Sequence, residues 1–336
     1  MRIFLIRHGE TVDNVAQVYA GSRDSELTNH GFNQATYLAR YLRDKGLSFT
    51  HLFASPLQRA LKTAQLIRDG QAAPEDPHPA PKQPLAITSL SVLKEQDFGS
   101  QEGKPWRDRP NGSDKVGKQP YQETQKDDPE SVDVESKESM AQRMDEFLDE
   151  HIAPLWQSAS EPDEHIVAIV SHGIILSVLW RRILRRLPPY SISFDREITV
   201  ERRSSSLENI CGFSNTGYLE LVMTAGESLA RVPTESNDEK QPTNTNDAGE
   251  SENSTSDLPQ APVRSPAADT EHVSTASSTT VPGAPKVLHG WVTKIKTING
   301  QEHMKTLKRT RGGVGSSKHD EKQKTLDSFF KRRRTD

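Results

Sequence analysis

Residues 1–226 alternate short apolar runs with amphipathic stretches, and this alternation leaves few folds open to the chain. Residues 2–6, 51–54 and 165–170 are apolar runs of the length of a buried strand. Residues 28–45 instead place apolar side chains at helical spacing, behind a threonine that can cap a helix. Strands separated by helices form a largely parallel sheet that helices cover on both faces. We therefore expect a three-layer α/β/α fold around a mainly parallel central sheet.

The remaining segments of this part of the chain fit the same scheme. Ser55-Pro56 predicts the start of a helix that continues to about residue 67, because proline suits a first helical turn. Ser139 and Gln142 have capping-box spacing ahead of an apolar periodicity that reaches residue 152. A further helix is predicted over residues 174–187, and short strands near residues 207–212 and 217–222.

Two polar insertions interrupt the predicted domain. Residues 70–84 contain five prolines, which predicts a loop. Residues 104–138 are mostly charged or polar, with Trp106 and Tyr121 as their only aromatic residues. Long loops inside domains are often functional, so the second insertion is either a cap over a substrate or a solvated excursion.

Beyond residue 226 the composition changes. In residues 227–285, 28 of 59 positions are Ser, Thr, Asn or Pro, and no aromatic residue, isoleucine or cysteine occurs. Such a segment buries too little apolar surface to offset the entropy of ordering, so we expect a disordered linker. The linker carries a net charge of −7 and residues 286–336 form a basic tail of net charge +9, so the overall charge of −4 conceals both. Residues 286–300 favour a β-hairpin but are too few to be stable alone.

Several protein classes are excluded by simple counts. The single cysteine, Cys211, excludes an intramolecular disulfide framework and a cysteine-cluster zinc site. The first ten residues reach charged side chains too early for the apolar core of a signal peptide. No run of about 18 apolar residues occurs, so no membrane-spanning helix is expected. We expect a soluble intracellular protein that makes no membrane contact.

Two similar motifs follow two of the predicted strands. Arg7-His8-Gly9 follows residues 2–6, and Ser171-His172-Gly173 follows residues 165–170. Ligands of parallel α/β sheets bind beyond the carboxyl ends of the strands. We therefore expect the two motifs to meet at one edge of the sheet and to form part of a site.

Four separated motifs, in this order, resemble the histidine phosphatase superfamily, whose fold is phosphoglycerate mutase-like. They are Arg7-His8-Gly9-Glu10 with Asn14, Arg59 in SPLQRALKTA, Glu95 in LKEQDFGSQEG, and Ser171-His172-Gly173. VYAGSRDSELTNHG and the closing NTGYLEL add to the resemblance, which covers most of residues 1–226. Taken singly, a histidine at a strand end is more often structural and a helical arginine is usually a solvated residue.

The resemblance implies a phosphatase that acts through a phosphohistidine intermediate, and the residue types suit that chemistry. His8 is then the nucleophile, and Arg7, Arg59, His172 and Asn14 bind the phosphoryl group. Guanidinium groups match phosphate oxygens geometrically, and His172 would add a third cationic donor if it is protonated. The implied catalytic residues are His8, Glu95 and His172, and the candidate substrate contacts are Gly21, Ser22 and Ser171.

Glu95 is the candidate general acid for the leaving group. We expect partial desolvation and the phosphate charge to raise the pKa of Glu95, because the carboxyl group must be protonated to act. The alternative is a surface carboxylate beside Lys94. No metal or other cofactor is needed, because the histidines show no HExxH spacing and Arg7 repels a cation next to His8.

The mutase branch of the superfamily departs from this sequence. Glycolytic mutases carry a threonine before the glycine that corresponds to Gly21, whereas this chain has Ala20. They also have an arginine-rich segment after the acid, where this chain reads EQDFGSQEG. Both differences favour a phosphomonoesterase of the histidine acid phosphatase type over a mutase. A non-catalytic nuclear scaffold that uses the fold for docking, in a DNA-associated or transcription complex, is the alternative from another class.

The tail contains a second motif, at residues 323–330. Gln323, Leu326, Phe329 and Phe330 match the PIP-box pattern and resemble the peptides that bind the sliding clamp PCNA. In such peptides the apolar residues converge on one face of a helical turn and fill a pocket as the peptide orders. The alternative is a chance match.

The next four residues, Lys331, Arg332, Arg333 and Arg334, predict a nuclear import signal read by an import receptor. The basic tail also predicts salt-sensitive, non-specific attraction to DNA, or merely keeps the chain soluble. We expect a nuclear protein, with a cytoplasmic pool as an alternative. Its partners would be the clamp, the import receptor and a phosphorylated small molecule or phosphoprotein as substrate.

Overall fold

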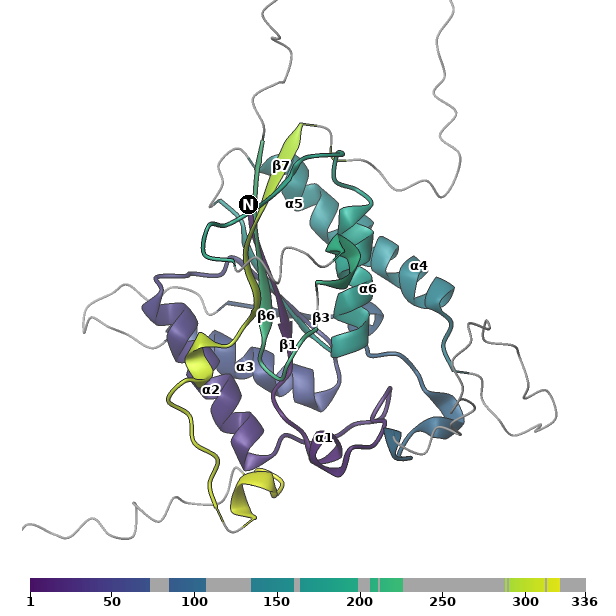
Figure 1. Ribbon diagram of the computed structural model, residues 1–336, viewed down its shortest axis with the longest axis vertical. Coiled ribbons are helices and arrows are strands. Elements are labelled where there is room, and N and C mark those ends of the chain that lie inside the picture. The colour runs from purple at the N-terminus through teal and green to yellow at the C-terminus, as the bar shows by residue number, and fades with distance from the viewer. Residues whose placement is uncertain are drawn as a thin grey trace, which may run out of the picture. The chain divides into compact units, whose positions relative to one another are not determined.

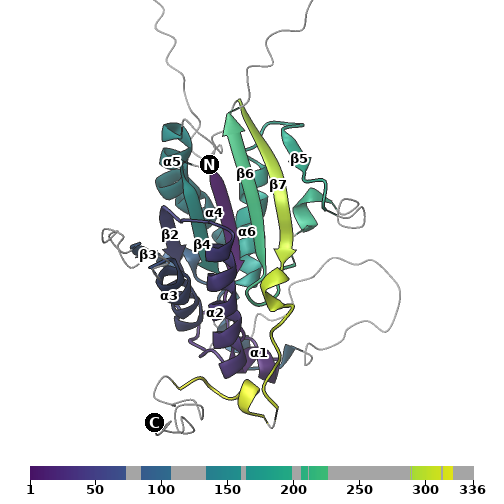
Figure 2. The ribbon, with the colours of Figure 1, turned by 90° about the vertical axis from the view of Figure 1, so that its left-hand side faces the viewer.

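Among the described residues, seven strands form one sheet in the order β3-β2-β4-β1-β6-β7-β5 (Figures 1 and 2). All pair in the same direction except β6, which is antiparallel to both of its neighbours. The strands are β1 Arg2–Arg7, β2 His51–Ala54, β3 Ile87–Ser89, β4 Ile166–Ser171, β5 Ile192–Phe194, β6 Tyr218–Ala225 and β7 Trp291–Gly300. The computed structural model describes residues 1–72, 85–106, 134–159, 164–198, 206–210, 212–225, 288, 290–311 and 313–320.

Helices cover both faces of the sheet, as the alternation of residues 1–226 predicts. The helices are α1 Val12–Ala16, α2 Asn29–Asp44, α3 Gln58–Ala72, α4 Lys137–Phe147, α5 Ala153–Ser158 and α6 Gly173–Leu184. Short helical turns occupy Ser91–Leu93, Gly99–Gln101, Leu148–Ile152, Leu207–Asn209, Glu302–Met304 and Val314–Ser316. The predicted three-layer α/β fold with a mainly parallel sheet is confirmed.

A hydrophobic core lies on each face of the sheet, and strand β1 contributes side chains to both. Its central residues are fully buried, and successive side chains point to opposite faces of the sheet. Ile3 and Leu5 pack in the core under α4, α5 and α6, whereas Phe4 and Ile6 pack in the core under α2 and α3. Figure 1 shows the sheet between these two groups of helices.

The caps of two helices follow the chemistry of their first residues. Thr28 caps α2, because its side chain accepts a hydrogen bond from the backbone N–H of Gly31, as predicted. Helix α4 begins earlier than the predicted capping box at Ser139, because Ser136 accepts from the Ser139 backbone N–H. The strand predicted near residues 207–212 is also wrong, since Leu207–Asn209 form a short helical turn.

The folded unit does not end at the predicted boundary of residue 226. Strand β7 pairs along β6 from Ala225↔Trp291 to Tyr218↔Gly300, and it also pairs with β5. It is a single strand in the sheet rather than the predicted hairpin. Its apolar residues Ile295 and Ile298 are buried, so the sheet supplies the core that this segment lacks on its own.

After β7 the chain continues along the unit to residue 320, and we name residues 290–311 and 313–320 the C-terminal segment. His319 stacks on Phe32 of α2 with ring centroids 3.8 Å apart, and its backbone N–H donates to the carbonyl of Leu27. Arg309 pairs with Glu10, so part of the predicted basic tail is held against the domain by its charges. The segment lies beside α2 in both ribbon views (Figures 1 and 2).

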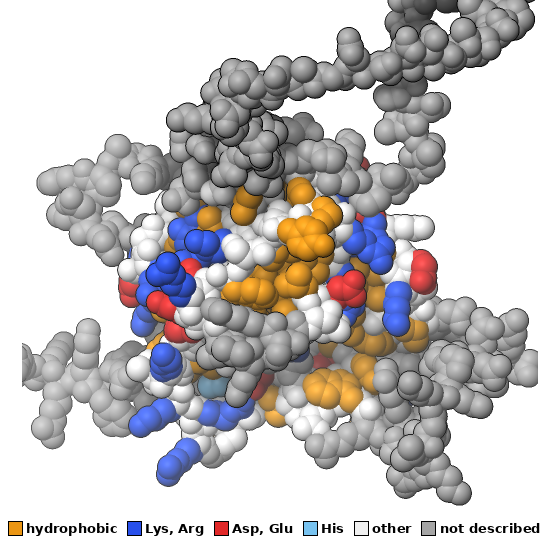
Figure 3. All heavy atoms as spheres, turned by 45° about the horizontal axis from the view of Figure 1, so that its top comes forward, with side chains coloured by type: hydrophobic (Ala, Val, Ile, Leu, Met, Phe, Trp, Pro, Cys, Tyr) orange, Lys and Arg blue, Asp and Glu red, His pale blue; other side chains and the backbone are white. Residues whose placement is uncertain are grey.

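The surface of the unit carries apolar as well as charged side chains. Figure 3 shows hydrophobic side chains gathered on one face, with arginine and lysine side chains around them. Tyr190 and Val292 are among the exposed large hydrophobic residues of the described chain. No described helix combines the length and the hydropathy that a membrane span requires.

Candidate active site

The carboxyl ends of β1, β2 and β4 place three polar residues side by side. β1 and β4 pair in register from Arg2↔Ile166 to Arg7↔Ser171, so the residues that follow them, His8 and His172, emerge together. The His8 backbone N–H donates to the carbonyl of Ser171 at 3.0 Å, and the two imidazole centroids lie 5.1 Å apart. Ser55 follows β2 at the same edge. The predicted meeting of the two histidine motifs is therefore what the structure shows.

The geometry of His8 leaves one ring nitrogen available. Nδ1 lies 2.7 Å from the carbonyl oxygen of Gly9, which can only accept, so Nδ1 carries the proton. Burial and the nearby charges of Arg59 and Arg7 hold the pKa of His8 well below its ordinary value. The ring is therefore neutral, and no described residue hydrogen-bonds to its Nε2. A neutral imidazole with a free Nε2 lone pair is the form that can act as a nucleophile.

His172 is fixed by hydrogen bonds at both ring nitrogens. Arg59 donates from Nε to Nδ1 over 3.1 Å, and Nε2 lies 2.8 Å from the Ser55 hydroxyl oxygen. Because Nδ1 accepts, the neutral ring carries its proton on Nε2 and donates it to Ser55. Burial, together with the charges of Arg59, His8 and Arg7, holds the pKa of His172 well below its ordinary value. The condition under which His172 would be a third cationic donor, a protonated ring, is therefore not met in this arrangement.

The guanidinium group of Arg7 has one nitrogen that donates to a described residue and one that does not. Its Nη1 donates to the carbonyl of Phe213 at 2.7 Å. Its Nε is buried and has no hydrogen-bond partner in the described part of the chain. A Cβ atom at Gly173 would lie in ordinary van der Waals contact with this Nε, at 3.7 Å. Burial lowers the pKa of Arg7, and the charge of Glu95 opposes that shift. An oxyanion at this edge would satisfy the unpaired N–H.

Arg59, on the first turn of α3, is anchored by the loop after α1. Its Nη1 and Nη2 donate to the carbonyls of Arg23 and Gly21 at 2.7 and 2.6 Å, in addition to the bond from Nε to His172. The side chain is 2% exposed, and this burial lowers its pKa to about 10, so the charge persists at neutral pH. Each terminal nitrogen keeps one further N–H, as a planar guanidinium has five donors.

Asn14 is oriented by its acceptor atom. Its Oδ1 accepts from the backbone N–H of Thr11 at 3.2 Å and from Nδ2 of Asn215 at 3.0 Å. The amide Nδ2 of Asn14 is thus left as a donor, and Asn14 lines the cavity described below. The predicted role of Asn14 as a neutral donor fits this orientation.

Glu95 reaches the same edge from the loop after Ser91–Leu93. Its carboxylate oxygens accept from the backbone N–H groups of Ile174 and Ile175, at 3.2 and 3.0 Å, and from that of Gln96 at 3.1 Å. Glu95 therefore sits at the positive N-terminus of α6, an arrangement that favours a carboxylate. Three backbone N–H groups hold Glu95 in the site, so it is not a free surface carboxylate beside Lys94.

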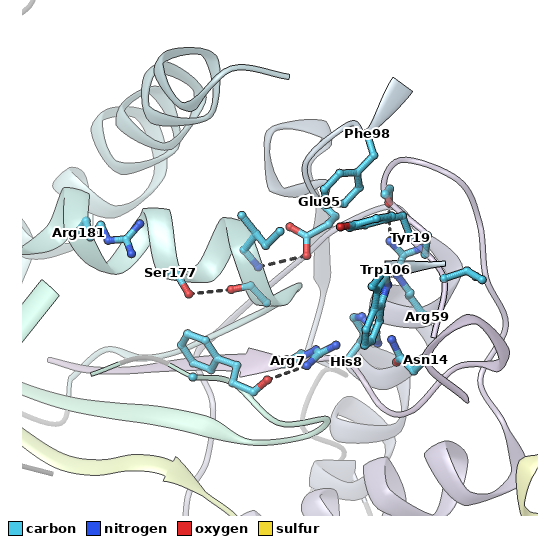
Figure 4. Close-up of a pocket in the computed structure, with 17 residues that line it drawn as sticks. Arg7, His8, Asn14, Tyr19, Arg59, Glu95, Phe98, Trp106, Ser177 and Arg181 are labelled. Atoms are coloured by element: carbon cyan, nitrogen blue, oxygen red, sulfur yellow. Dashed lines mark hydrogen bonds between the residues drawn. The ribbon is translucent and has the colours of Figure 1, made fainter. Parts of the chain in front are cut away.

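These side chains line one cavity of about 700 Å³ (Figure 4). Arg7, His8, Asn14 and Arg59 lie together at one end, and Arg181 lies farther along α6. Tyr19 and Phe98, whose ring centroids are 4.6 Å apart, form part of an aromatic wall. The other lining residues are Val18, Ala20, Gly21, Glu95, Trp106, Gly173, Ile174, Ser177, Gly212 and Phe213.

The family of the chain follows from comparison with known proteins. A model of the histidine phosphatase superfamily (branch 1) matches residues 3–196, more than half of the chain. The chain belongs to the histidine phosphatase superfamily. The matched range includes His8, Arg59 and Glu95, which line the cavity, and the fully buried His172, which accepts a hydrogen bond from Arg59.

Similar proteins within the histidine phosphatase superfamily are named either as phosphoglycerate mutases or as phosphatases. A probable phosphoglycerate mutase GpmB of Erwinia tasmaniensis is 34% identical over 188 residues, covering 55% of this chain and 75% of its own. A probable phosphatase of Schizosaccharomyces pombe is 35% identical over 183 residues, covering 54% and 56%. A broad-specificity phosphatase of Saccharomyces cerevisiae is 27% identical over 203 residues, covering 60% and 78%. The family and its phosphatases support an enzyme that acts on phosphate esters.

The three candidate substrate contacts have different positions in this histidine phosphatase. Gly21 lines the cavity, with its backbone in the left-handed region at φ 55°. Ser22 is half-buried, and its backbone and hydroxyl both donate to Oε1 of Glu102, at 2.6 and 3.0 Å. Ser171 is fully buried and donates to the carbonyl of Leu93 at 2.7 Å. Ser171 is therefore a structural residue, because its position before His172 directs its side chain into the core.

Sequence reasoning missed several residues that organise the site. Glu102 holds the loop whose carbonyls anchor Arg59, and a Cβ at Gly21 would lie 2.1 Å from its carboxylate. Ser55 follows a strand as the two histidines do, so its place could have been predicted from the same pattern. Asn215 and Thr216 begin the closing NTGYLEL, which added to the resemblance but indicated no role for either side chain. Of the described residues, no group of three or more His, Cys, Asp or Glu side chains could hold a metal ion.

The predicted tail motifs lie outside the described residues. These are the clamp-binding residues Gln323, Leu326, Phe329 and Phe330 and the import signal at residues 331–334. Residues 73–84, 107–133 and 227–285, which include most of both predicted insertions and the predicted linker, also lie outside them.

Proposed function

We propose that this chain is a phosphatase that hydrolyses phosphomonoesters through a phosphohistidine at His8. The observation that carries the proposal is the neutral His8 ring, whose Nδ1 is tied to Gly9 and whose Nε2 is free beside the unpaired Nε of Arg7. A phosphoryl group in this corner is bound by guanidinium groups of opposite charge while it faces a nucleophile. Positioning and charge stabilisation of this kind account for most of the catalysis of phosphoryl transfer.

In the first step, the Nε2 lone pair of His8 forms a bond to phosphorus as the bond to the ester oxygen breaks. Arg7, Arg59 and the Nδ2 group of Asn14 stabilise the charge on the three equatorial oxygens. His172 acts as a neutral residue that orients the Arg59 guanidinium through its Nδ1. The Nδ1 bond to Gly9 then stabilises the positive charge that develops on the His8 ring.

Glu95 supplies the proton for the leaving oxygen in this scheme. Glu95 lines the same cavity as His8, so its carboxyl group can donate the proton to the leaving oxygen as the phosphorus–oxygen bond breaks. In the second step Glu95 removes a proton from water as the water oxygen attacks phosphorus and the N–P bond breaks. His8 returns to its neutral form, and the products are an alcohol and inorganic phosphate.

The cavity favours a substrate with a body larger than glycerate. A volume of about 700 Å³ and the wall formed by Tyr19 and Phe98 provide apolar contact for a ring or an extended chain beyond the phosphate. Ala20, where a mutase has threonine, lines the same cavity, and the loss of that hydroxyl supports hydrolysis over transfer between hydroxyl groups. A phosphorylated small molecule and a phosphoprotein side chain both fit this description.

A trapping experiment tests the nucleophile. The purified chain is mixed with a ³²P-labelled phosphomonoester and quenched in alkali, and turnover of p-nitrophenyl phosphate is measured from pH 5 to 8. We expect label on the wild type that is stable to alkali and labile to acid, and none on His8→Ala, with turnover at least about a thousandfold lower. His51→Ala, at the start of β2, is the matched control and keeps full turnover. Equal turnover in His8→Ala and the wild type would refute the assignment.

We also propose that the tail tethers the phosphatase to the sliding clamp PCNA in the nucleus. Support comes from the spacing of Gln323, Leu326, Phe329 and Phe330 and from the basic run at residues 331–334. The described chain remains packed on α2 as far as His319, which stacks on Phe32. The motif therefore begins only a few residues beyond this contact with the catalytic unit.

Titration of the full chain with PCNA tests the tether. Phe329→Ala with Phe330→Ala should weaken binding at least about a hundredfold, because the two aromatic anchors are removed. Lys331→Ala with Arg332→Ala is the control for non-specific charge and should mainly change the salt dependence. Unchanged affinity in the double phenylalanine variant would remove the tether. Loss of nuclear accumulation in cells after deletion of residues 331–334 tests the import signal.

A further inference from the structure

The loop at residues 214–217 hydrogen-bonds to the backbone of Arg7 and His8 and to the side chain of Asn14. The Thr216 backbone N–H donates to the carbonyls of Arg7 and His8, at 3.1 and 3.2 Å. The Asn215 side chain donates from Nδ2 to the carbonyl of His8 at 3.1 Å and to Oδ1 of Asn14 at 3.0 Å. Two neighbouring residues thus fix the backbone of the nucleophile and the side chain of a phosphate-binding residue.

This loop is itself held by the C-terminal segment. Asn299, near the end of β7, accepts from the Ser214 backbone N–H at 2.9 Å and donates to the Ser214 hydroxyl at 3.1 Å. His303, in the helical turn after β7, places Nε2 at 2.8 Å from the Thr216 hydroxyl oxygen. Residues about 300 positions from His8 in the chain therefore reach it through one intervening loop.

The hydrogen bonds that join His303, Thr216 and Asn215 form a relay. The position of each proton in this relay follows from which atoms can only accept. The Thr216 hydroxyl donates to the carbonyl of Asn215 at 2.7 Å, so His303 must donate to the Thr216 oxygen from Nε2. Nδ1 of His303 is buried and has no hydrogen-bond partner among the described residues, which fits a lone pair and not an N–H. Burial also lowers the pKa of His303 to about 4, so the ring is neutral at neutral pH. The direction of the relay runs from His303 through Thr216 to Asn215.

Backbone strain indicates why the loop needs this support. Thr216 has φ 56° and Asn299 has φ 46°, both in the left-handed region that residues other than glycine rarely adopt. Such conformations persist only where the surrounding contacts impose them. Gly217 packs so closely that an added Cβ would lie 2.1 Å from Oδ1 of Asn299. Without the C-terminal segment, Thr216 would relax and release the carbonyls of Arg7 and His8.

We propose that His303 and Asn299 are positioning residues of the phosphatase, and that the C-terminal segment completes the active site. This inference rests on the proposed function, since it assigns these residues to the orientation of His8 and Asn14. The match to the superfamily ends at residue 196, so the loop and both positioning residues lie outside it. Asn299 and His303 thus position the active site, so the chain after residue 290 is not only a carrier of the tail motifs.

The test is a kinetic comparison of full-length variants. His303→Leu removes the donor to Thr216 and should lower kcat and the single-turnover rate of His8 phosphorylation by about ten- to a hundredfold. His303→Gln retains an N–H donor and should recover most of that loss. His319→Ala, which alters another contact of the C-terminal segment on α2, between two half-buried rings, is the matched control and should leave kcat within about twofold.

A second variant covers the case in which His303→Leu does not fold. Asn299→Gly removes both bonds to Ser214, while glycine accepts the φ of 46° without strain, so folding is retained and kcat still falls. Wild-type kcat in folded Asn299→Gly or His303→Leu overturns the inference, and so does a loss in His303→Gln as large as that in His303→Leu. If the wild type itself forms no phosphohistidine, the proposed function fails instead, so the two failures are distinguishable.

Discussion

Protonation of His303 should make the folded protein less stable as the pH falls below neutral. The ring is buried between Thr216, Tyr41 and Tyr218, with its centroid 6.2 Å from that of Tyr41 and 6.5 Å from that of Tyr218. Burial lowers its pKa to about 4 from an ordinary value of 6.5, and Glu302 only partly opposes this shift. The unfolded chain therefore binds a proton between these two pH values that the folded chain does not.

The sign and size of the effect follow from proton linkage. A histidine whose pKa is lowered by folding contributes full stability above pH 6.5 and loses it as the pH falls from 6.5 towards 4. With one pKa unit worth 1.36 kcal/mol, His303 should reduce the free energy of unfolding by about 2 kcal/mol between pH 7 and pH 5. His8 and His172 have lowered pKa values as well, so the whole protein should lose more than this.

Urea denaturation of the wild type and His303→Leu at pH 7 and pH 5 isolates this contribution. His303→Leu is less stable than the wild type at pH 7, because the Thr216 hydroxyl oxygen loses its donor. From pH 7 to pH 5, however, the variant should lose about 2 kcal/mol less than the wild type, since leucine does not titrate. His8 and His172 are present in both proteins, so their effects cancel in the difference.

One result would refute the reasoning. If the wild type and His303→Leu lose the same free energy between the two pH values, His303 has an ordinary pKa and is accessible to water in the folded protein. The proton assignment of the relay to Thr216 would then have to be abandoned. A control substitution of the exposed Lys308 should leave the pH dependence as it is in the wild type.

Three further predictions concern packing, charge and substrate affinity. Gly31→Ala should destabilise the fold by about 3 kcal/mol in urea denaturation, because the added Cβ would lie 2.0 Å from the Glu10 carbonyl oxygen, whereas Gly212→Ala enters open space and should change little. Asp145→Ala should cost about 3 kcal/mol by the same measurement, because it removes one partner of the buried Arg186 guanidinium. Glu102→Ala should raise KM for p-nitrophenyl phosphate about tenfold, because the loop that anchors Arg59 loses its acceptor.

Each of these predictions has an opposite outcome. Wild-type stability of Gly31→Ala would mean that the loop after β1 does not press on α2 as closely as described. Wild-type stability of Asp145→Ala would mean that Asp149 alone compensates the charge of Arg186. An unchanged KM in Glu102→Ala would show that Arg59 does not depend on the loop for its position.

The part of the fold that could be predicted depends on local patterns. The apolar runs ending at His8 and His172 identified β1 and β4, and parallel register then placed both histidines at one edge. Thr28 identified the start of α2 because a cap acts on the N–H groups next to it. Strand patterns and helix caps each depend on a few neighbouring residues, so they can be recognised in the sequence without knowledge of the tertiary structure.

The part that could not be predicted depends on distant contacts. Strand β7 follows β6 only after a long polar stretch, so nothing near residues 291–300 indicated a partner. The charge of His172 was left open because it depends on the burial of the ring and on Arg59, which donates to Nδ1 from another helix. Ser171 was misjudged because its side chain direction is set by β4, which turns it to Leu93.

Ala225, the last residue of β6, pairs with Trp291, the first residue of β7. The polar stretch between these strands therefore leaves the sheet and returns to it at the same place. A cut anywhere between these two strands would divide the polypeptide into two pieces without removing a single bond from the sheet. Both pieces should remain together and active on a sizing column in buffer and separate only in denaturant. Lengthening that stretch should also cost little, about 0.6 kcal/mol for each doubling.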